Sequence, residues 1–255
     1  MNLPTPEDLK RFEAAREKII GLERLRPGIG TLSEKTVHAV VKNFIEPDDE
    51  KHEIPVAGFV ADILTDASGQ EEIIEIQTRA MYKMKKKLDI FLRMYPVTIV
   101  YPIPREKKLC WVDEDTGEVS KPRKSNKKGT DYVAFSEIYG LKDYLLHPNI
   151  RFRLLFMDMT EYKLLNGYGP SRKIRAEKYD RIPESLIGWT DLSCPEDYMQ
   201  LIPADLPDEF KVDDFSKSTK LRRDEAGMAV QILRTVGVIE KIGKDKRAYV
   251  YRCKY

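Results

Sequence analysis

Two carboxylates lie in segments of the chain that are otherwise apolar. Asp62 is part of the run FVADIL, residues 59–64, and Glu75 is part of the run EIIEIQT, residues 72–78. Both runs are apolar almost throughout, which favours strands that are covered on both faces. A buried carboxylate is costly unless it is paired, protonated or bound to a metal ion. Two of them on adjacent strands predict a site for Mg²⁺ or Mn²⁺, because these ions prefer oxygen ligands and retain bound water.

The two carboxylates need two strands side by side, and the residues between them supply a turn. Residues 66–70, DASGQ, have the composition of a hairpin loop between strands predicted at 58–65 and 72–78. Because side chains alternate between the faces of a strand, Glu75 is expected to share a face with Gln77. The remaining pattern predicts helices at 5–25, 33–45, 80–94 and 132–146, strands at 52–56, 97–103 and 151–159, and a hairpin at 109–112 and 118–120.

Glu34 supplies a third carboxylate at the start of the helix predicted over 33–45. It precedes Val37 and Val41, which belong to the apolar stripe of that helix, so the helix turns Glu34 toward whatever the stripe packs against. Thr-Leu-Ser-Glu also fits a capping box, in which Glu34 accepts a backbone N–H at the helix start. The two roles do not exclude each other. His38 lies one turn after Glu34 and could reach the site, but a histidine on the surface of the helix is its simpler interpretation.

The segment of about residues 30–105 resembles the PD-(D/E)XK nuclease superfamily. The resemblance rests on the order helix, strands, helix, strand and on four residues: Glu34, Asp62, Glu75 and Gln77. It implies an α/β fold with a restriction-endonuclease-like αβββαβ core and a mixed central sheet. It also implies that Asp62 and Glu75 bind the metal ion and that Glu34 assists through a water molecule. The third motif residue, usually lysine, would orient or activate the attacking water, and here that residue is Gln77.

Gln77 is a departure from the superfamily pattern, because glutamine cannot act as an acid, a base or a cation. The Glu-x-Gln spacing is also similar to that of the nuclease-like domain of a bacterial competence protein family. A lysine could be recruited from the helix predicted over 80–94, where Lys83, Lys86 and Lys87 are equal candidates. The implied activity is metal-assisted hydrolysis of a phosphodiester bond, in which Gln77 positions the water by hydrogen bonding.

Basic residues follow Gln77 directly in the sequence. They are expected to hold a phosphate backbone, and they are Arg79, Lys83, Lys86 and Lys87. An alternative interpretation is purely structural, in which Asp62 and Glu75 form ion pairs with Arg79 or a nearby lysine, since buried charges are usually paired.

The C-terminal segment, residues 210–255, resembles a winged helix-turn-helix. Helices are predicted at 212–218 and 222–236, followed by strands at 238–242 and 248–252. Basic residues lie where such a module contacts DNA, at the start of the second helix and at the wing tip: Lys220, Arg222, Arg223 and Lys246. Asp224 and Glu225 beside them weaken this interpretation, and a protein-binding module is the alternative.

Composition sets limits on the function. With 44 basic and 42 acidic residues the formal net charge is +2, so nucleic-acid binding depends on local patches, such as the basic loops at 121–128 and 172–178. The three cysteines are scattered without a CxxC motif, which argues against a disulfide framework and a cysteine zinc site. The N-terminus has no signal-peptide pattern, and no apolar run approaches the roughly 20 residues of a membrane span. A cytoplasmic protein is expected.

The expected organisation is a nuclease-like domain at 1–165, a connecting segment at 166–200 and a winged-helix domain at 201–255. Three hypotheses follow. The first is a metal-dependent nuclease acting on DNA. The second is a nuclease-fold protein that has lost catalysis and binds DNA. The third is a regulator in which the winged helix acts and the N-terminal domain dimerises or binds a partner. A homodimer is left open.

Overall fold

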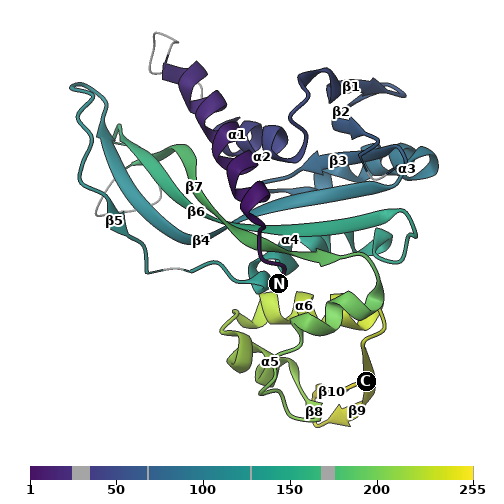
Figure 1. The fold of residues 1–255 in the computed structure, drawn as a ribbon. Helices are drawn as coiled ribbons and strands as arrows, with labels where there is room; N and C mark the ends of the chain where they lie inside the picture. Colours follow the sequence, from purple (N-terminus) through teal and green to yellow (C-terminus); the bar gives the residue numbers. More distant parts are fainter. Residues whose placement is uncertain (25–34, 68, 127, 168–175, 255) are drawn as a thin grey trace.

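A mixed sheet of seven strands lies at the centre of the computed structural model, which describes residues 1–24, 35–67, 69–126, 128–167 and 176–254 (Figure 1). The strands are β1 (His52–Val56), β2 (Phe59–Thr65), β3 (Glu72–Ile76), β4 (Val97–Asp113), β5 (Arg123–Lys124), β6 (Ile150–Leu165) and β7 (Glu177–Leu192). Their order in the sheet is β1-β2-β3-β4-β6-β7, and β5 pairs with β4. The predicted α/β fold with a mixed sheet is confirmed.

Strand directions change across the sheet. The first three strands are antiparallel neighbours, β4 runs parallel to both β3 and β6, and β7 returns antiparallel to β6. A parallel neighbour requires a crossover connection. The crossover between β3 and β4 contains α3 (Lys85–Met94), preceded by the 3₁₀ helix η2 (Met81–Met84). The basic residues that follow Gln77 therefore belong to a segment that packs back on the sheet.

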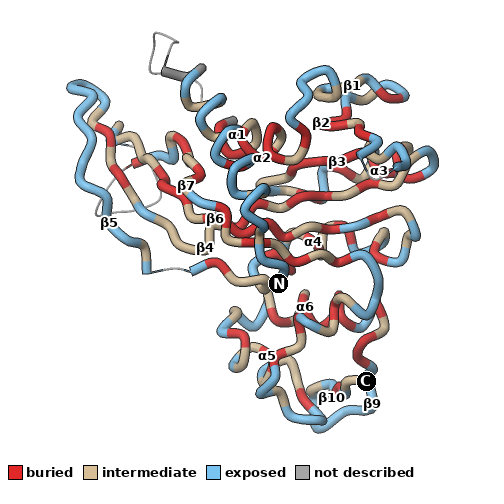
Figure 2. The backbone as a smooth tube through the Cα atoms, in the orientation of Figure 1, coloured by how far each residue is buried: buried red, intermediate tan, exposed pale blue. Residues whose placement is uncertain are grey.

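Helices cover both faces of the sheet (Figure 1). On one face, α1 (Pro6–Arg24) and α2 (Lys35–Ile45) bury Phe12, Val37 and Val41 against the sheet. The other face carries α3 and the short helices η3 (Asp131–Ala134), α4 (Phe135–Ile138) and η4 (Tyr139–Tyr144). These three pieces replace the continuous helix predicted at 132–146. Figure 2 shows the buried backbone concentrated along the central strands. No helix in the described ranges is both long and apolar enough to cross a membrane.

Two sequence predictions for the long strands are wrong. The strand predicted at 97–103 continues as β4 to Asp113, with a register irregularity after Pro104. The hairpin expected at 109–112 and 118–120 is present as a short pairing, in which Val112 pairs with Val119, Asp113 N donates to Glu118 O at 2.9 Å and Ser120 N donates to Trp111 O at 2.8 Å. Residues 177–192 were expected to connect two domains but form β7, paired along β6. Polar residues, Pro183 and Gly188 hide the alternation of this strand, which is buried at every second position only near its end.

The C-terminal segment forms a second, three-stranded sheet in the order β8-β10-β9. Its elements are β8 (Glu209–Phe210), α5 (Val212–Thr219), α6 (Arg223–Thr235), β9 (Ile239–Asp245) and β10 (Ala248–Cys253), preceded by the 3₁₀ helix η5 (Pro195–Leu201). The predicted helices and hairpin are thus present with small shifts of their ends. This unit packs on the first: the Phe215 ring lies 6.4 Å from the rings of both Tyr132 and Phe135. One hydrophobic core runs through both.

Candidate active site

Asp62 and Glu75 meet where β2 and β3 stop pairing. The ladder between these strands ends at the pair Ile63–Ile74. Beyond it, each carboxylate bonds to the backbone of the other strand: Ile76 N donates to Asp62 Oδ2 at 2.8 Å, and Asp62 N donates to Glu75 Oε1 at 3.2 Å. The side chains thus replace the missing backbone hydrogen bonds. This reciprocal bridge fixes the two carboxylates beside each other, as the sequence predicted.

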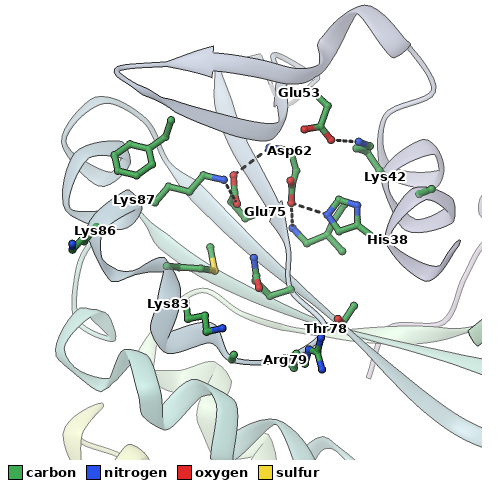
Figure 3. Close-up of a pocket in the computed structure, with 16 residues that line it drawn as sticks. His38, Lys42, Glu53, Asp62, Glu75, Thr78, Arg79, Lys83, Lys86 and Lys87 are labelled. Atoms are coloured by element: carbon green, nitrogen blue, oxygen red, sulfur yellow. Dashed lines mark hydrogen bonds and ion pairs between the residues drawn. The ribbon is translucent and has the colours of Figure 1, made fainter. Parts of the chain in front are cut away.

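His38 is the second partner of Asp62. It lies on α2, and its Nε2 is 3.1 Å from Asp62 Oδ2 (Figure 3). The expectation of a plain helix-surface histidine is therefore wrong. Asp62 Oδ1 has no hydrogen-bond partner among the residues that the structure describes, and the side chain keeps 15% of its exposure. One oxygen of Asp62 is oriented by the protein, and the other remains accessible for a ligand.

Lys87 is the lysine that α3 brings to the site. Its Nζ lies 2.6 Å from Glu75 Oε2, with the lysine side chain 19% exposed and the glutamate 1% exposed. The same Nζ lies 5.3 Å from the centre of the Phe91 ring, one helical turn further on. Figure 3 shows Lys87 reaching toward Glu75, whereas Lys86 points away. The structure thus ranks the three lysines that the sequence left equal.

The two carboxyl groups differ in acidity. Burial, followed by the charge of Asp62, raises the pKa of Glu75 to about 7, although Lys87 opposes the shift. Burial also opposes ionisation of Asp62. There, however, the hydrogen bond and charge of His38, the Ile76 N–H and Lys87 outweigh it and lower the pKa. The pair therefore places a charged carboxylate beside one that titrates near neutral pH. Such separation is common at functional sites.

A pocket of about 960 Å³ opens over these groups. Five cationic side chains line it, and they are Lys42, Arg79, Lys83, Lys86 and Lys87. The carboxylates in its lining are Glu53, Asp62 and Glu75. Five positive charges against three negative ones leave the pocket basic, even though the whole chain is nearly neutral. Such a surface suits an anionic ligand.

A tight turn carries the chain from β3 into the pocket wall. Gln77 N donates to Val100 O at 2.9 Å, which continues the parallel ladder by one residue. Ala80 then adopts the left-handed region, with φ 55°, before η2 begins. A residue with a Cβ in this region costs on the order of 1 kcal/mol. Strain of this kind is concentrated near ligand-binding segments, and here it places Arg79 and Lys83 on the wall.

The other predicted site residues are not all at this pocket. Glu34 lies outside the described residues, so its role stays a prediction. Lys220 and Lys246 are exposed in the C-terminal unit and do not line the pocket. Arg222 and Arg223 there are paired, with Glu225 at 2.9 Å and with Asp213 at 2.6 Å. In the basic loop at 121–128, Lys124 and Lys128 pair with Glu106, while Lys127 and residues 172–175 of the other loop are outside the description.

Comparison with known proteins places the chain in a family. A family model described as Domain of unknown function (DUF8091) matches residues 35–192. The chain belongs to this family. The range matched by DUF8091 begins at the start of α2 and ends with β7, so it contains His38, Asp62, Glu75 and Lys87. A protein of Treponema pallidum (strain Nichols), described as "Uncharacterized protein", is 25% identical over 224 residues, which is 88% of this chain and 87% of that protein. No solved structure gives a significant match.

The ionised form of Glu75 should lower the free energy of unfolding, because its carboxylate is buried. Its pKa of about 7, against 4.5 in an unfolded chain, means that folding favours the protonated form. Ionisation therefore weakens the fold as pH rises from about 4.5 through about 7. We expect Glu75→Gln, with Asp62 left to balance Lys87, to raise the free energy of unfolding by up to about 3 kcal/mol at pH 8 and by little at pH 4.5.

Urea unfolding in EDTA across this pH range measures the difference. Glu71→Gln is the matched control, because Glu71 is exposed and its replacement should change stability by less than about 0.5 kcal/mol at any pH. A Glu75→Gln variant that is less stable than wild type at pH 8 would instead identify Glu75 and Lys87 as a stabilising ion pair.

Proposed function

We propose that this protein is a metal-dependent nuclease that hydrolyses phosphodiester bonds of DNA. The observation that carries the proposal is the convergence of Asp62, Glu75 and Lys87 in one basic pocket, at the point where β2 and β3 diverge. These are an acid pair and a lysine, the residue types that the PD-(D/E)XK resemblance requires. Lys87, arriving from α3, is the residue we assign to the role that Gln77 cannot fill.

The order of elements supports the same proposal. The run α2, β1, β2, β3, α3, β4 has the sequence αβββαβ, with β1 to β3 antiparallel and β4 parallel to β3. This order supports the restriction-endonuclease-like core that the resemblance implies. The C-terminal order β8, α5, α6, β9, β10, with β10 between β8 and β9, likewise supports a winged-helix fold. Both fold assignments are part of the proposal.

The residues present fit a divalent cation of the Mg²⁺ type. Asp62 offers an accessible carboxylate oxygen. A cation between the two carboxylates would relieve the repulsion by Asp62 that, after burial, raises the pKa of Glu75. Mg²⁺ commonly uses only one or two protein carboxylates and completes its shell with water and phosphate. Among the described residues, a set that excludes Glu34, no group of three or more His, Cys, Asp or Glu side chains could hold a metal ion, so the proposal rests on Asp62 and Glu75 alone.

Asp62 and Glu75 would hold Mg²⁺ or Mn²⁺. When bound, the ion supplies Lewis-acid chemistry that polarises the scissile phosphate and makes a water more acidic. The chain's own groups do the rest. His38 keeps Asp62 oriented through Oδ2. Lys87 uses one of its three N–H donors on Glu75, which leaves two for a water or a phosphate oxygen as negative charge develops.

The remaining pocket residues would position the substrate. Gln77 can orient the attacking water by hydrogen bonding, and Arg79, Lys83 and Lys86 can hold neighbouring phosphates. The net reaction forms a bond from the water oxygen to phosphorus and breaks the bond from phosphorus to one deoxyribose oxygen. That oxygen takes up one proton from the water and leaves as the hydroxyl. No redox partner or further co-reactant is needed.

The direct test is incubation of supercoiled plasmid and of single-stranded DNA with purified protein in Mg²⁺, Mn²⁺ or EDTA. We expect cleavage with either metal, none in EDTA, and none by an Asp62→Ala, Glu75→Ala variant purified in parallel. Absence of cleavage together with retarded DNA on a gel would favour the alternative, a nuclease-fold protein that binds DNA without cutting it. Two observations favour this alternative: Lys87 already forms an ion pair with Glu75, and Gln77 stands where the resemblance implies lysine.

A further inference from the structure

Tyr82 is an exposed aromatic side chain next to the pocket. It is 58% exposed, and among the aromatic residues of the described ranges only Tyr249, at 43%, is also classed as exposed. The Tyr249 ring is covered by Lys241 and Lys244, whose Nζ atoms lie 4.2 and 4.8 Å from its centre. The Tyr82 ring has no ring or cation contact with any other described residue. One face of an aromatic ring is therefore available to a ligand.

The backbone at Tyr82 is fixed by buried neighbours, a hydrogen bond and a close contact with η4. Met81 and Met84, on either side of it, are buried at 0% and 4% exposure. Met81 N donates to Glu137 Oε2 at 3.0 Å, which fixes the start of η2. Gly140 of η4 lies against it so closely that an added Cβ would stand 3.0 Å from the Tyr82 Cβ. The backbone that carries the ring is thus fixed before any ligand binds.

Basic residues flank Tyr82 in the sequence. Lys83 and Lys86 belong to the same stretch of η2 and α3, line the pocket and form no ion pair with another described residue. Arg79 and Ala80, just before it, line the pocket as well. Figure 3 shows Arg79 and Lys83 on the pocket side opposite Glu53. An aromatic ring between cations beside an anion-binding pocket is the arrangement by which proteins bind single-stranded nucleic acid, because each base offers a face for stacking.

We infer that Tyr82 stacks on an unpaired base next to the scissile phosphate, and that the preferred substrate is single-stranded DNA or a single-stranded end. This inference rests on the proposed nuclease function. In a continuous duplex both faces of each base are already stacked on neighbours, so the ring has no face to contact. Lys83 and Lys86 hold the phosphates on either side of the stacked base. Tyr82 is a substrate-binding residue and takes no part in the chemical step.

Binding is measured by fluorescence anisotropy, with a labelled single-stranded oligonucleotide and with its duplex, in Ca²⁺ so that turnover does not interfere. We expect Tyr82→Ala to weaken single-strand binding by about tenfold and duplex binding by less than twofold. Tyr82→Trp and Tyr82→Phe should keep the wild-type preference. Leu146→Ala, at a residue that is 64% exposed and does not line the pocket, is the control and should change neither. Thermal unfolding verifies that each variant folds.

Two outcomes overturn the inference. One is a Tyr82→Ala variant that binds the single strand as wild type does, and the other is an equal loss for single strand and duplex. Cleavage by wild type is followed in parallel, so the two proposals can fail separately. If wild type cleaves in the presence of Mg²⁺ and Tyr82→Ala keeps the preference, the nuclease stands and the stacking role falls. If wild type does not cleave but Tyr82→Ala loses the single strand selectively, the stacking role stands and the nuclease falls.

Discussion

Asp62→Asn is expected to lower metal-dependent cleavage at least about 1000-fold, because an amide keeps the shape of the side chain but removes the charge that holds the cation. The amide oxygen can still accept the Ile76 N–H, so the bridge between β2 and β3 should survive and the variant should fold. Single-turnover cleavage under saturating protein measures the loss. The same substitution should abolish the rise in melting temperature that Mn²⁺ gives wild type.

Glu53→Gln is the matched control for Asp62→Asn. Glu53 lines the same pocket but bonds to Lys42, on the side of the pocket away from Lys87 (Figure 3). Its loss should change the rate by only a few fold. An Asp62→Asn variant that retains a tenth of the activity, or a Glu53→Gln variant that loses as much as Asp62→Asn does, would contradict the assignment of the metal-binding pair.

Lys87→Met should lower the cleavage rate by about 100-fold, because it removes a donor from the position where charge develops in the transition state. Methionine keeps the length and packing of the lysine stem beside Phe91. Lys86→Met, one residue earlier and pointing away from Glu75, should weaken DNA binding a few fold and leave the rate at saturation nearly unchanged. Rates at saturating DNA separate the two effects.

Rescue provides the sharper check on Lys87. Gln77 and Lys87 line the same pocket, so a lysine introduced by Gln77→Lys should restore part of the activity lost in Lys87→Met. If Lys87→Met and Lys86→Met reduce the rate equally, or if Gln77→Lys has no effect on the Lys87→Met background, Lys87 has only the general role of a basic residue.

The carboxylate pair could be predicted from sequence because its determinants are local. Apolar runs around Asp62 and Glu75, joined by a short turn, define a hairpin whose register brings the two together. The partners from other elements could not be predicted in the same way. Whether Lys83, Lys86 or Lys87 faces Glu75 depends on the left-handed residue Ala80 and on one 3₁₀ turn. A 3₁₀ turn has three residues, so it changes the phase of the following helix.

His38 and β7 show the same limit. His38 sits beside the buried residue Val37 on α2, and only the placement of α2 against the divergent end of β2 brings it to Asp62. The strand β7 pairs with β6, and its polar composition carries little strand signal by itself. In both cases the deciding contact is made between two different elements, and periodicity within one element cannot reveal it.

The contact of Phe215 with Phe135 and Tyr132 has a consequence for how the chain can be divided. The family match ends at Leu192, but the hydrophobic core does not. A fragment trimmed to the matched range would leave Phe135 facing water on the side from which α5 and α6 had been removed. It would also remove the contacts of α6 with η4, the helix whose Gly140 packs against Tyr82. The C-terminal unit is therefore not a separable domain. Its removal would loosen η4, and through η4 it would loosen η2, which carries Lys83 and Met84 of the pocket lining.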